Sequence, residues 1–291
     1  MNHIKDQIRC GAAYRLGLTG KGIGVAVLDT GIFLHRDFDS RVTGFADMVN
    51  GKTFAYDDCG HGTHICGIIG GSGRMSGGRY SGIAPGCDLV MVKVLDRRGN
   101  GYSSDVLAGI SWILERKEKL GIRILNISVG ACSKRGMSEN SALVKGVNRA
   151  WDAGLVVVVA AGNNGPRTMS ITTPGISRKV ITVGCSDDDR EVLVGGNRMV
   201  DYSGRGPTAA CKPDLVAPGC SVVSCAGRAD KYTIKSGTSM STPIVSGATA
   251  LLLERYPDMT NKDVKLKLRE SCTDIGLPRN QQGWGLLDVE K

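Results

Sequence analysis

The sequence predicts an α/β protein built as a three-layer sandwich, with a largely parallel central sheet flanked by helices. Continuous apolar runs at 23–28 and 155–161 are typical of strands that are buried on both faces, and 89–95 is expected to be a further strand. Helical patterns separate these runs, and strands that alternate with helices form parallel sheets with right-handed crossovers. Polar side chains that follow such strands are therefore expected to meet at one edge of the sheet.

The elements can be assigned in chain order. A loop through Asp57 and Asp58 leads to a helix of small residues that starts at His61. Ser138 is a candidate cap for the helix at 140–153, because serine oxygens accept from free N–H groups at a helix start. Pro243 is expected in the first turn of the helix that opens at Ser239, where no helical N–H is lost. The remaining expected elements are strands at 122–129 and 180–183, an amphipathic helix at 104–119, and a helical end near Pro257.

Composition limits the class of protein. The 291 residues, 41% of them hydrophobic, are expected to form one globular domain over 1–291. No apolar run approaches the roughly 18–20 residues that a membrane-spanning helix needs. The net charge of +9 comes from scattered basic residues, and aromatic residues, at 5%, are not interleaved with them. Nucleic-acid binding is therefore not expected, and the oligomeric state stays open.

The cysteines and the N-terminus indicate the compartment. Residues 1–7 carry no apolar signal region, and ten cysteines without a signal favour a reducing, cytoplasmic environment. The alternative is a secreted protein from which a signal or prodomain was removed. Asp29 lies so near Met1 that we expect either a mature form or a chain that folds unaided. Cys59, two residues before His61, is expected to be exposed, with its thiolate favoured by a nearby imidazolium.

Three polar residues stand where reactive groups are expected. Asp29 ends a buried strand, His61 lies between glycines at a helix start, and Ser239 begins an apolar helix. A serine at a helix start is often only a cap. Together, however, the three supply a nucleophile, a base for its proton, and an acid that orients the base. Asn163 follows the strand at 155–161, where its amide can donate to a developing oxyanion.

These motifs resemble those of the subtilisin-like serine proteases, the subtilases. The matching segments are 29–31, 61–64, 161–163 and 237–243, with weaker matches at 126–130 and 283–288, all in family order. The resemblance implies a serine endopeptidase with Asp29, His61 and Ser239 as the catalytic triad and Asn163 in the oxyanion hole. The alternative is a catalytically silent scaffold that binds peptides.

The resemblance also implies a substrate cleft. An extended peptide is expected to pair between two backbone edges, and an uncharged first pocket favours an apolar residue before the cleaved bond. The implied substrate-binding residues are Gly99, Asn100, Gly101, Ser128, Val129, Gly130, Ala161, Gly162 and Thr172.

No metal or cofactor is expected to be required for the chemistry, and structural calcium stays an open alternative. The calcium loop of many secreted subtilases is not visible at 70–82, although Asp37 resembles a family calcium ligand in position. We expect Asp37 and the three acids at 187–189 to be solvated. Cys59, His61, His64 and Cys66 are spaced too closely for a usual zinc site, and His64 is expected to be buried and hydrogen-bonded. The P-loop-like run at 46–53 lacks its strand and helix.

Overall fold

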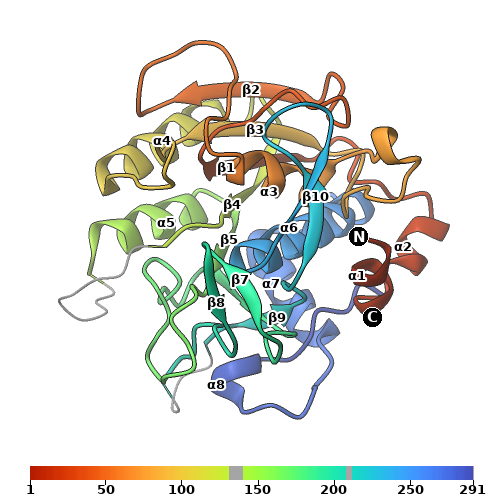
Figure 1. Ribbon diagram of the computed structural model, residues 1–291, viewed down its shortest axis with the longest axis vertical. Coiled ribbons are helices and arrows are strands. Elements are labelled where there is room, and N and C mark those ends of the chain that lie inside the picture. Colours follow the sequence, from red (N-terminus) through yellow and green to blue (C-terminus); the bar gives the residue numbers. More distant parts are fainter. Residues whose placement is uncertain (131–139, 208–211, 291) are drawn as a thin grey trace.

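The computed structural model describes residues 1–130, 140–207 and 212–290. Within that part of the chain, seven strands form a parallel sheet in the order β2-β3-β1-β4-β5-β6-β9 (Figure 1). The expected sandwich with a parallel central sheet is confirmed. The strands are β1 (Gly24–Asp29), β2 (Val42–Asp47), β3 (Asp88–Lys93), β4 (Ile122–Ile127), β5 (Val156–Ala160), β6 (Ile181–Cys185) and β9 (Leu215–Ala217).

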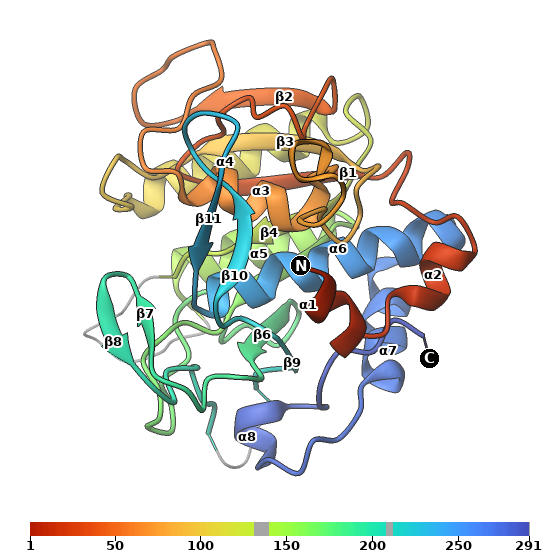
Figure 2. The ribbon, with the colours of Figure 1, turned by 45° about the vertical axis from the view of Figure 1, so that its right-hand side comes forward.

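Helices cover the two faces of this sheet (Figures 1 and 2). On one face lie α4 (Ser103–Arg116) and α5 (Ala142–Asp152), and a side chain added at Gly109 of α4 would meet Leu28 and Val92. On the other face lie α3 (His61–Gly70) and α6 (Thr238–Arg255), which pack against each other. Ser246 of α6 donates to the Asn126 side chain of β4. Further helices are α1 (Asn2–Gln7), α2 (Gly11–Arg15), α7 (Asn261–Ser271) and α8 (Arg279–Gln282).

Side-chain alternation along β1 sets the direction of its last residue. Leu28 points toward α4, so Asp29, the next residue, points to the face that carries α3. β1 lies between β3 and β4 in the sheet, and Asp29 pairs in register with Lys93. The carboxylate is thus placed at the carboxyl edge of a central strand, where open α/β sheets place their sites.

Several strands of the structure were not predicted from the sequence. β2 is half-buried and mixes glycine and polar residues with apolar ones, so it lacks the continuous apolar run of a central strand. A strand does lead into the run at 46–53, contrary to expectation. β2 ends at Asp47 and continues into a turn, and no helix begins between Asp47 and His61, so the run does not have the strand–loop–helix arrangement of a P-loop. Two antiparallel hairpins were also not predicted: β7 (Val192–Val194) with β8 (Asn197–Met199), and β10 (Val222–Cys225) with β11 (Tyr232–Lys235).

Of two expectations about helix starts, the one for Pro243 was wrong, and the one for Ser138 falls outside the described residues. Ser141 caps α5 by accepting from Val144 N, whereas Ser138 lies outside the described residues. Pro243 lies inside α6 and not in its first turn, because the helix already begins at Thr238. Proline lacks the N–H that would otherwise reach the carbonyl four residues earlier. The carbonyl of Ser239 is therefore left without that helical partner.

The two ends of the described chain lie side by side (Figures 1 and 2). Val289 N donates to Ile8 O, and Arg9 pairs with Asp288. The main hydrophobic cluster includes residues from Ile4 of α1 to Leu287. The assignment of 1–291 to a single domain stays a prediction. Among the described residues, no helix is long and apolar enough to cross a membrane.

Candidate active site

The aspartate and histidine singled out above are in direct contact. Asp29 ends β1 and His61 begins α3, and His61 Nδ1 lies 2.7 Å from Asp29 Oδ1. Asp29 is fully buried, and the His61 side chain is 23% exposed. Oδ1 also accepts from Thr30 N at 2.7 Å, while the buried Oδ2 has no hydrogen-bond partner among the described residues. A buried carboxylate with one unsatisfied oxygen strongly favours positive charge on its neighbour.

A network of side chains holds α3 against the end of β1. Thr30 Oγ1 donates to Asp57 Oδ1 at 2.9 Å and accepts from Gly62 N at 2.9 Å. Asp57 also accepts from Gly60 N and from the backbone and hydroxyl of Thr63. A side chain at Gly62 would lie 2.2 Å from Gly31 O, so only glycine permits this approach. The expected loop through Asp57 thus caps the histidine helix.

Ser239 lies at the same edge of the sheet. It stands one residue into α6, is half-buried, and donates through Oγ to Ser128 O at 2.8 Å. Ser128 directly follows β4, the neighbour of β1. In this conformation the hydroxyl is directed to a carbonyl, and no hydrogen bond between Ser239 and His61 is found among the described residues.

Asn163, just after β5, is oriented by the residue before Ser239. Its Oδ1 accepts from Thr238 N at 3.0 Å and from Thr238 Oγ1 at 3.1 Å. Gly162 N donates to the same hydroxyl at 3.2 Å. With its oxygen engaged in this way, the amide presents Nδ2 as its remaining donor. A side chain built at Gly237 would meet that nitrogen at 3.3 Å, so the NH₂ group faces the turn that precedes Ser239.

Burial and charge act in opposite directions on the pKa of His61. Burial lowers it, but the charge of Asp29 and its hydrogen bond outweigh that effect and raise the pKa above the ordinary value. The neighbouring His64 is fully buried without a carboxylate partner, and burial together with the charge of Lys235 lowers its pKa to about 3. His64 Nε2 lies 3.1 Å from Val222 O, which confirms the expected hydrogen-bonded core histidine.

The predicted substrate-binding residues lie in two places, around a cavity and around Thr172. Gly99, Asn100 and Gly101 line a cavity of about 210 Å³ together with Val129 and Gly130, and Leu95, Val106 and Leu143 supply apolar walls. Thr172 lies instead between two glycines, since an added side chain at Gly130 or Gly162 would meet it at 2.2 and 2.5 Å. Thr172 Oγ1 donates to Ala161 O at 3.4 Å. Ser128 is buried beside Ser239.

Some residues that build the site were not predicted. Lys93 is fully buried, and its Nζ donates to Thr30 O at 2.6 Å, Asp58 Oδ1 at 2.7 Å and Leu95 O at 2.9 Å. A single lysine inside an apolar strand was the signal that could have revealed it. Thr30 and Thr238 were visible as motif neighbours, but their hydroxyl contacts depend on tertiary geometry.

Three expectations about acids and thiols were wrong. Asp37 is fully buried and accepts from Met75 N at 2.9 Å and Tyr232 Oη at 2.7 Å, so it is not a solvated turn residue. Asp188 is also buried, and its carboxylate accepts a hydrogen bond from Ser203 N at 2.7 Å. Cys59 is exposed as expected, but desolvation by its surroundings raises its thiol pKa, so the expected thiolate is not favoured.

The parallel sheet flanked by helices, with Asp29, His61 and Ser239 at one edge, has the fold of the subtilisin-like proteins. The family model described as the subtilase family matches residues 20–285, and the chain belongs to this family.

Named relatives agree with this membership. The chain is 42% identical over 292 residues to serine protease AprX of Bacillus subtilis (strain 168), covering 94% of this chain and 65% of that protein. It is 34% identical to subtilisin BL of Lederbergia lenta, covering 98% of this chain and 96% of that protein. Among solved structures, Sphericase superposes with a TM-score of 0.80 at 31% identity, covering 94% of this chain and 93% of the other. The chain thus spans about two thirds of AprX and nearly all of subtilisin BL.

The opposing effects on His61 lead to a titration test. We expect the pKa of His61 to lie above the ordinary value of about 6.5, and Asp29→Asn to move it below that value, because burial then acts unopposed. Imidazole titration by NMR measures both. His64 is the internal control and should stay neutral well below pH 6 in both proteins. An unchanged His61 titration in Asp29→Asn would show that the carboxylate does not control this imidazole.

Proposed function

We propose that this chain is a serine endopeptidase in which Asp29, His61 and Ser239 act as a triad. The observation that carries the proposal is the 2.7 Å contact between His61 Nδ1 and the buried Asp29, at the sheet edge that also holds Ser239. With Nδ1 engaged by the carboxylate, Nε2 is left as the proton acceptor.

The reaction begins when Ser239 Oγ turns from the Ser128 carbonyl toward His61. Oγ attacks the peptide carbonyl carbon, and its proton passes to His61 Nε2. The imidazolium that forms is stabilised by Asp29, whose charge already raises the pKa of His61. The proton then moves to the leaving amine as the C–N bond breaks, and water releases the acyl group by the same route.

Asn163 is proposed to stabilise the oxyanion of the tetrahedral intermediate together with the Ser239 backbone N–H. Two hydrogen bonds from Thr238 fix the amide oxygen, which supports Nδ2 as the donor toward the reacting carbonyl. A donor held before the reaction costs no reorganisation when negative charge develops. Thr238 is a positioning residue in this arrangement.

The nucleophile is tested by Ser239→Ala. We expect this variant to lose turnover while its unfolding temperature stays near that of the parent, because the side chain makes one hydrogen bond at a half-buried position. In subtilisin the loss of the serine costs ~10⁶ in kcat, which sets the scale. Peptide cleavage by the purified variant and its thermal unfolding are measured together.

Asn163→Ala is the matched variant in the same experiment. It keeps the nucleophile, so it should still react with a fluorophosphonate probe while kcat falls by ~10²–10³, the scale known from subtilisin. The alternative, a silent peptide-binding scaffold, requires that the parent protein neither reacts with the probe nor cleaves peptides. Substantial cleavage by Ser239→Ala would instead remove Ser239 as the nucleophile.

The substrate is proposed to be a peptide or protein segment that lies extended between the edges at 99–101 and 128–130, with an apolar residue before the cleaved bond. The apolar walls of the cavity beside these edges support this proposal. Thr172, between Gly130 and Gly162, takes up space where the first pocket is expected. A smaller residue there would deepen the pocket.

Thr172→Gly tests this pocket. We expect the ratio of kcat/KM for a peptide with Phe before the cleaved bond to that for the Ala peptide to rise by about tenfold, because a pocket enlarged by a few carbon atoms changes discrimination on that scale. The Ala peptide serves as the internal control for general damage. An unchanged ratio would place Thr172 outside the pocket, and a parent preference for Asp or Glu would refute an apolar pocket.

No cofactor is proposed for the chemistry, and Asp37 does not fit a calcium ligand in this chain. Its Oδ1 accepts from Met75 N, while Oδ2 accepts from Tyr232 Oη and faces the Cys225 thiol at 3.7 Å. Donors that point at both oxygens occupy the directions a cation would need.

Calcium addition tests this assignment. We expect added Ca²⁺ to leave the unfolding temperature of the parent protein unchanged. Asp37→Asn should lower stability by about 1–3 kcal/mol with or without calcium, because buried donors lose a charged acceptor. Stabilisation of the parent by calcium that disappears in Asp37→Asn would contradict the proposal.

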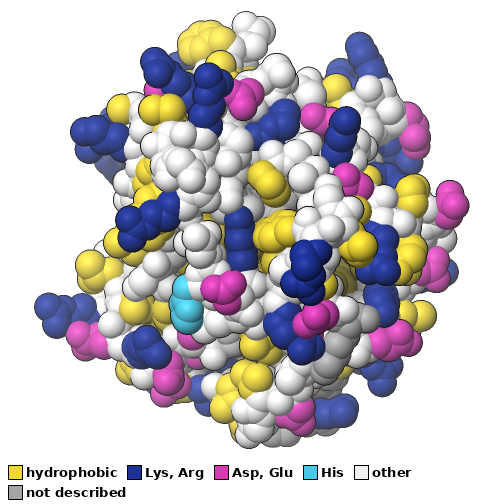
Figure 3. Space-filling model, turned by 90° about the vertical axis from the view of Figure 1, so that its right-hand side faces the viewer, with side chains coloured by type: hydrophobic (Ala, Val, Ile, Leu, Met, Phe, Trp, Pro, Cys, Tyr) yellow, Lys and Arg dark blue, Asp and Glu magenta, His cyan; other side chains and the backbone are white. Residues whose placement is uncertain are grey.

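The cellular setting is proposed from the thiols and the surface. Seven cysteines within the described ranges are free thiols, which supports a reducing, cytoplasmic environment; they are Cys10, Cys59, Cys66, Cys87, Cys185, Cys220 and Cys225. The kinship with bacterial subtilases fits the secreted alternative, and the thiol state of the protein taken from its natural source separates the two. On the face in Figure 3, basic side chains alternate with acidic ones, which supports a protein partner over nucleic acid.

A further inference from the structure

A second polar cluster lies behind the turn that precedes Ser239. Cys185 ends β6, Asp187 follows two residues later, and Cys220 lies three residues after β9. The two sulfur atoms and a carboxylate oxygen of Asp187 all lie within 4.8 Å of one another. Tyr202 Oη stands 3.2 Å from Cys185 Sγ and 3.1 Å from Cys220 Sγ.

We propose that Cys185, Asp187 and Cys220 form a binding site for one thiophilic divalent metal ion of the zinc type. Two sulfur ligands select a soft or borderline cation over calcium or magnesium. Two ligand sulfurs in a tetrahedral zinc site lie about 3.8 Å apart, which follows from Zn–S bonds of about 2.3 Å. The sulfurs therefore need to approach each other by no more than about 1 Å.

The surroundings of the three ligands support binding. Gly219 N donates to Asp187 Oδ1 at 2.7 Å and Cys220 N donates to it at 3.1 Å, so the carboxylate is already held in place. The Tyr202 hydroxyl can donate to a thiolate once the metal has displaced the thiol protons to solvent. Cys220 and Asp187 are only half-buried, which provides a path for the ion and room for water as the fourth ligand.

A second cluster of possible metal ligands is less suited to bind an ion. His35, Asp37 and Cys225 also lie within 4.8 Å of one another, but all three are buried. His35 Nδ1 accepts from Asp37 N at 3.1 Å and His35 Nε2 lies 3.1 Å from Lys231 O, so both ring nitrogens are occupied. That cluster has neither a free imidazole nitrogen nor a path from solvent.

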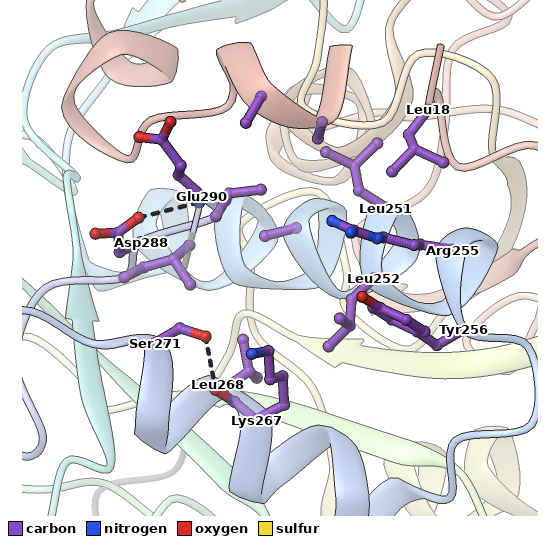
Figure 4. A pocket seen from close by; sticks show the side chains of 15 residues that line it. Leu18, Leu251, Leu252, Arg255, Tyr256, Lys267, Leu268, Ser271, Asp288 and Glu290 are labelled. Carbon is purple, nitrogen blue, oxygen red and sulfur yellow. Dashed lines mark hydrogen bonds between the residues drawn. The ribbon is translucent and has the colours of Figure 1, made fainter. Parts of the chain in front are cut away.

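A cavity of about 180 Å³ between α6, α7 and the C-terminal segment is lined by apolar and charged side chains (Figure 4). Leu251 and Leu252 lie on one side of it, and Asp288 and Glu290 lie on the other. It holds no cluster of ligand atoms comparable to the two thiols. The cluster at Cys185 is therefore the stronger site.

The metal site is also connected to the nucleophile turn. Gly219 donates to Asp187 through its N–H and accepts from Gly237 N through its carbonyl at 3.0 Å. Gly237 is the residue before Thr238 and Ser239. A bound ion would thus hold the segment against which this turn is hydrogen-bonded.

Cadmium titration tests the site directly. The full chain carrying Ser239→Ala, which prevents self-cleavage, is titrated with Cd²⁺ under reducing conditions. We expect one equivalent to bind with the ultraviolet charge-transfer absorption of two cadmium–thiolate bonds, and Zn²⁺ to displace it. Cys185→Ser and Cys220→Ser should each remove at least half of this absorption. Asp187→Asn should weaken binding by about tenfold or more, since it keeps the shape and loses the charge.

Cys272→Ser is the matched control, because Cys272 is also half-buried but lies elsewhere in the fold, and it should bind as the parent does. Far-ultraviolet circular dichroism checks that each variant is folded. Cys185 is fully buried, so the half-buried Cys220→Ser and Asp187→Asn keep the test valid if Cys185→Ser does not fold. Absorption that is absent in the parent, or unchanged in Cys220→Ser and Asp187→Asn, would overturn the proposal.

Discussion

The site depends on one constraint, the hydroxyl of Thr30, which joins the end of β1 to the start of α3. It donates to Asp57 and accepts from Gly62 N, so a strand end and a helix start share one hydrogen-bonded centre. Asp29 directly precedes Thr30 in the chain, and His61 directly precedes Gly62. Their 2.7 Å contact is therefore fixed by backbone placement and not by long flexible side chains. This arrangement holds the imidazole ring in one orientation against the carboxylate.

Buried charge explains why the neighbourhood of Asp29 is built as it is. A carboxylate without solvent needs compensation, and the residues around it supply this in two ways. His61 gains a raised pKa from the carboxylate, and Lys93 brings a buried ammonium group to the carbonyl of Thr30 and to Asp58. His64, which is fully buried and has no acid beside it, has its pKa lowered to about 3. The same residue type thus behaves oppositely at two positions three residues apart, because only one of them faces a carboxylate.

The sequence was sufficient for the central strands and for the residues at their ends. β1 and β5 are continuous apolar runs, β3 and β4 are mostly apolar, and a parallel sheet brings their carboxyl ends together, so Asp29 and Asn163 could be placed at one edge. It was insufficient where burial depends on distant partners. Asp37 looked like a turn residue, but Tyr232, 195 residues later, covers it with its hydroxyl. Ser141 and Pro243 depended on helix starts, which patterns locate only to within a few residues.

The turn before Ser239 shows how the separate parts become one site. Gly237 adopts φ +142°, which favours glycine, and this places Thr238 so that its N–H and its hydroxyl both reach Asn163. The same glycine donates to Gly219, and Gly219 donates to Asp187. The start of α6, the amide after β5 and the thiol cluster after β6 are therefore linked by hydrogen bonds through the Gly219 and Gly237 backbone. The cluster and the turn before Ser239 are thus joined by hydrogen bonds through Gly219 and Gly237, and not only by packing in the hydrophobic core.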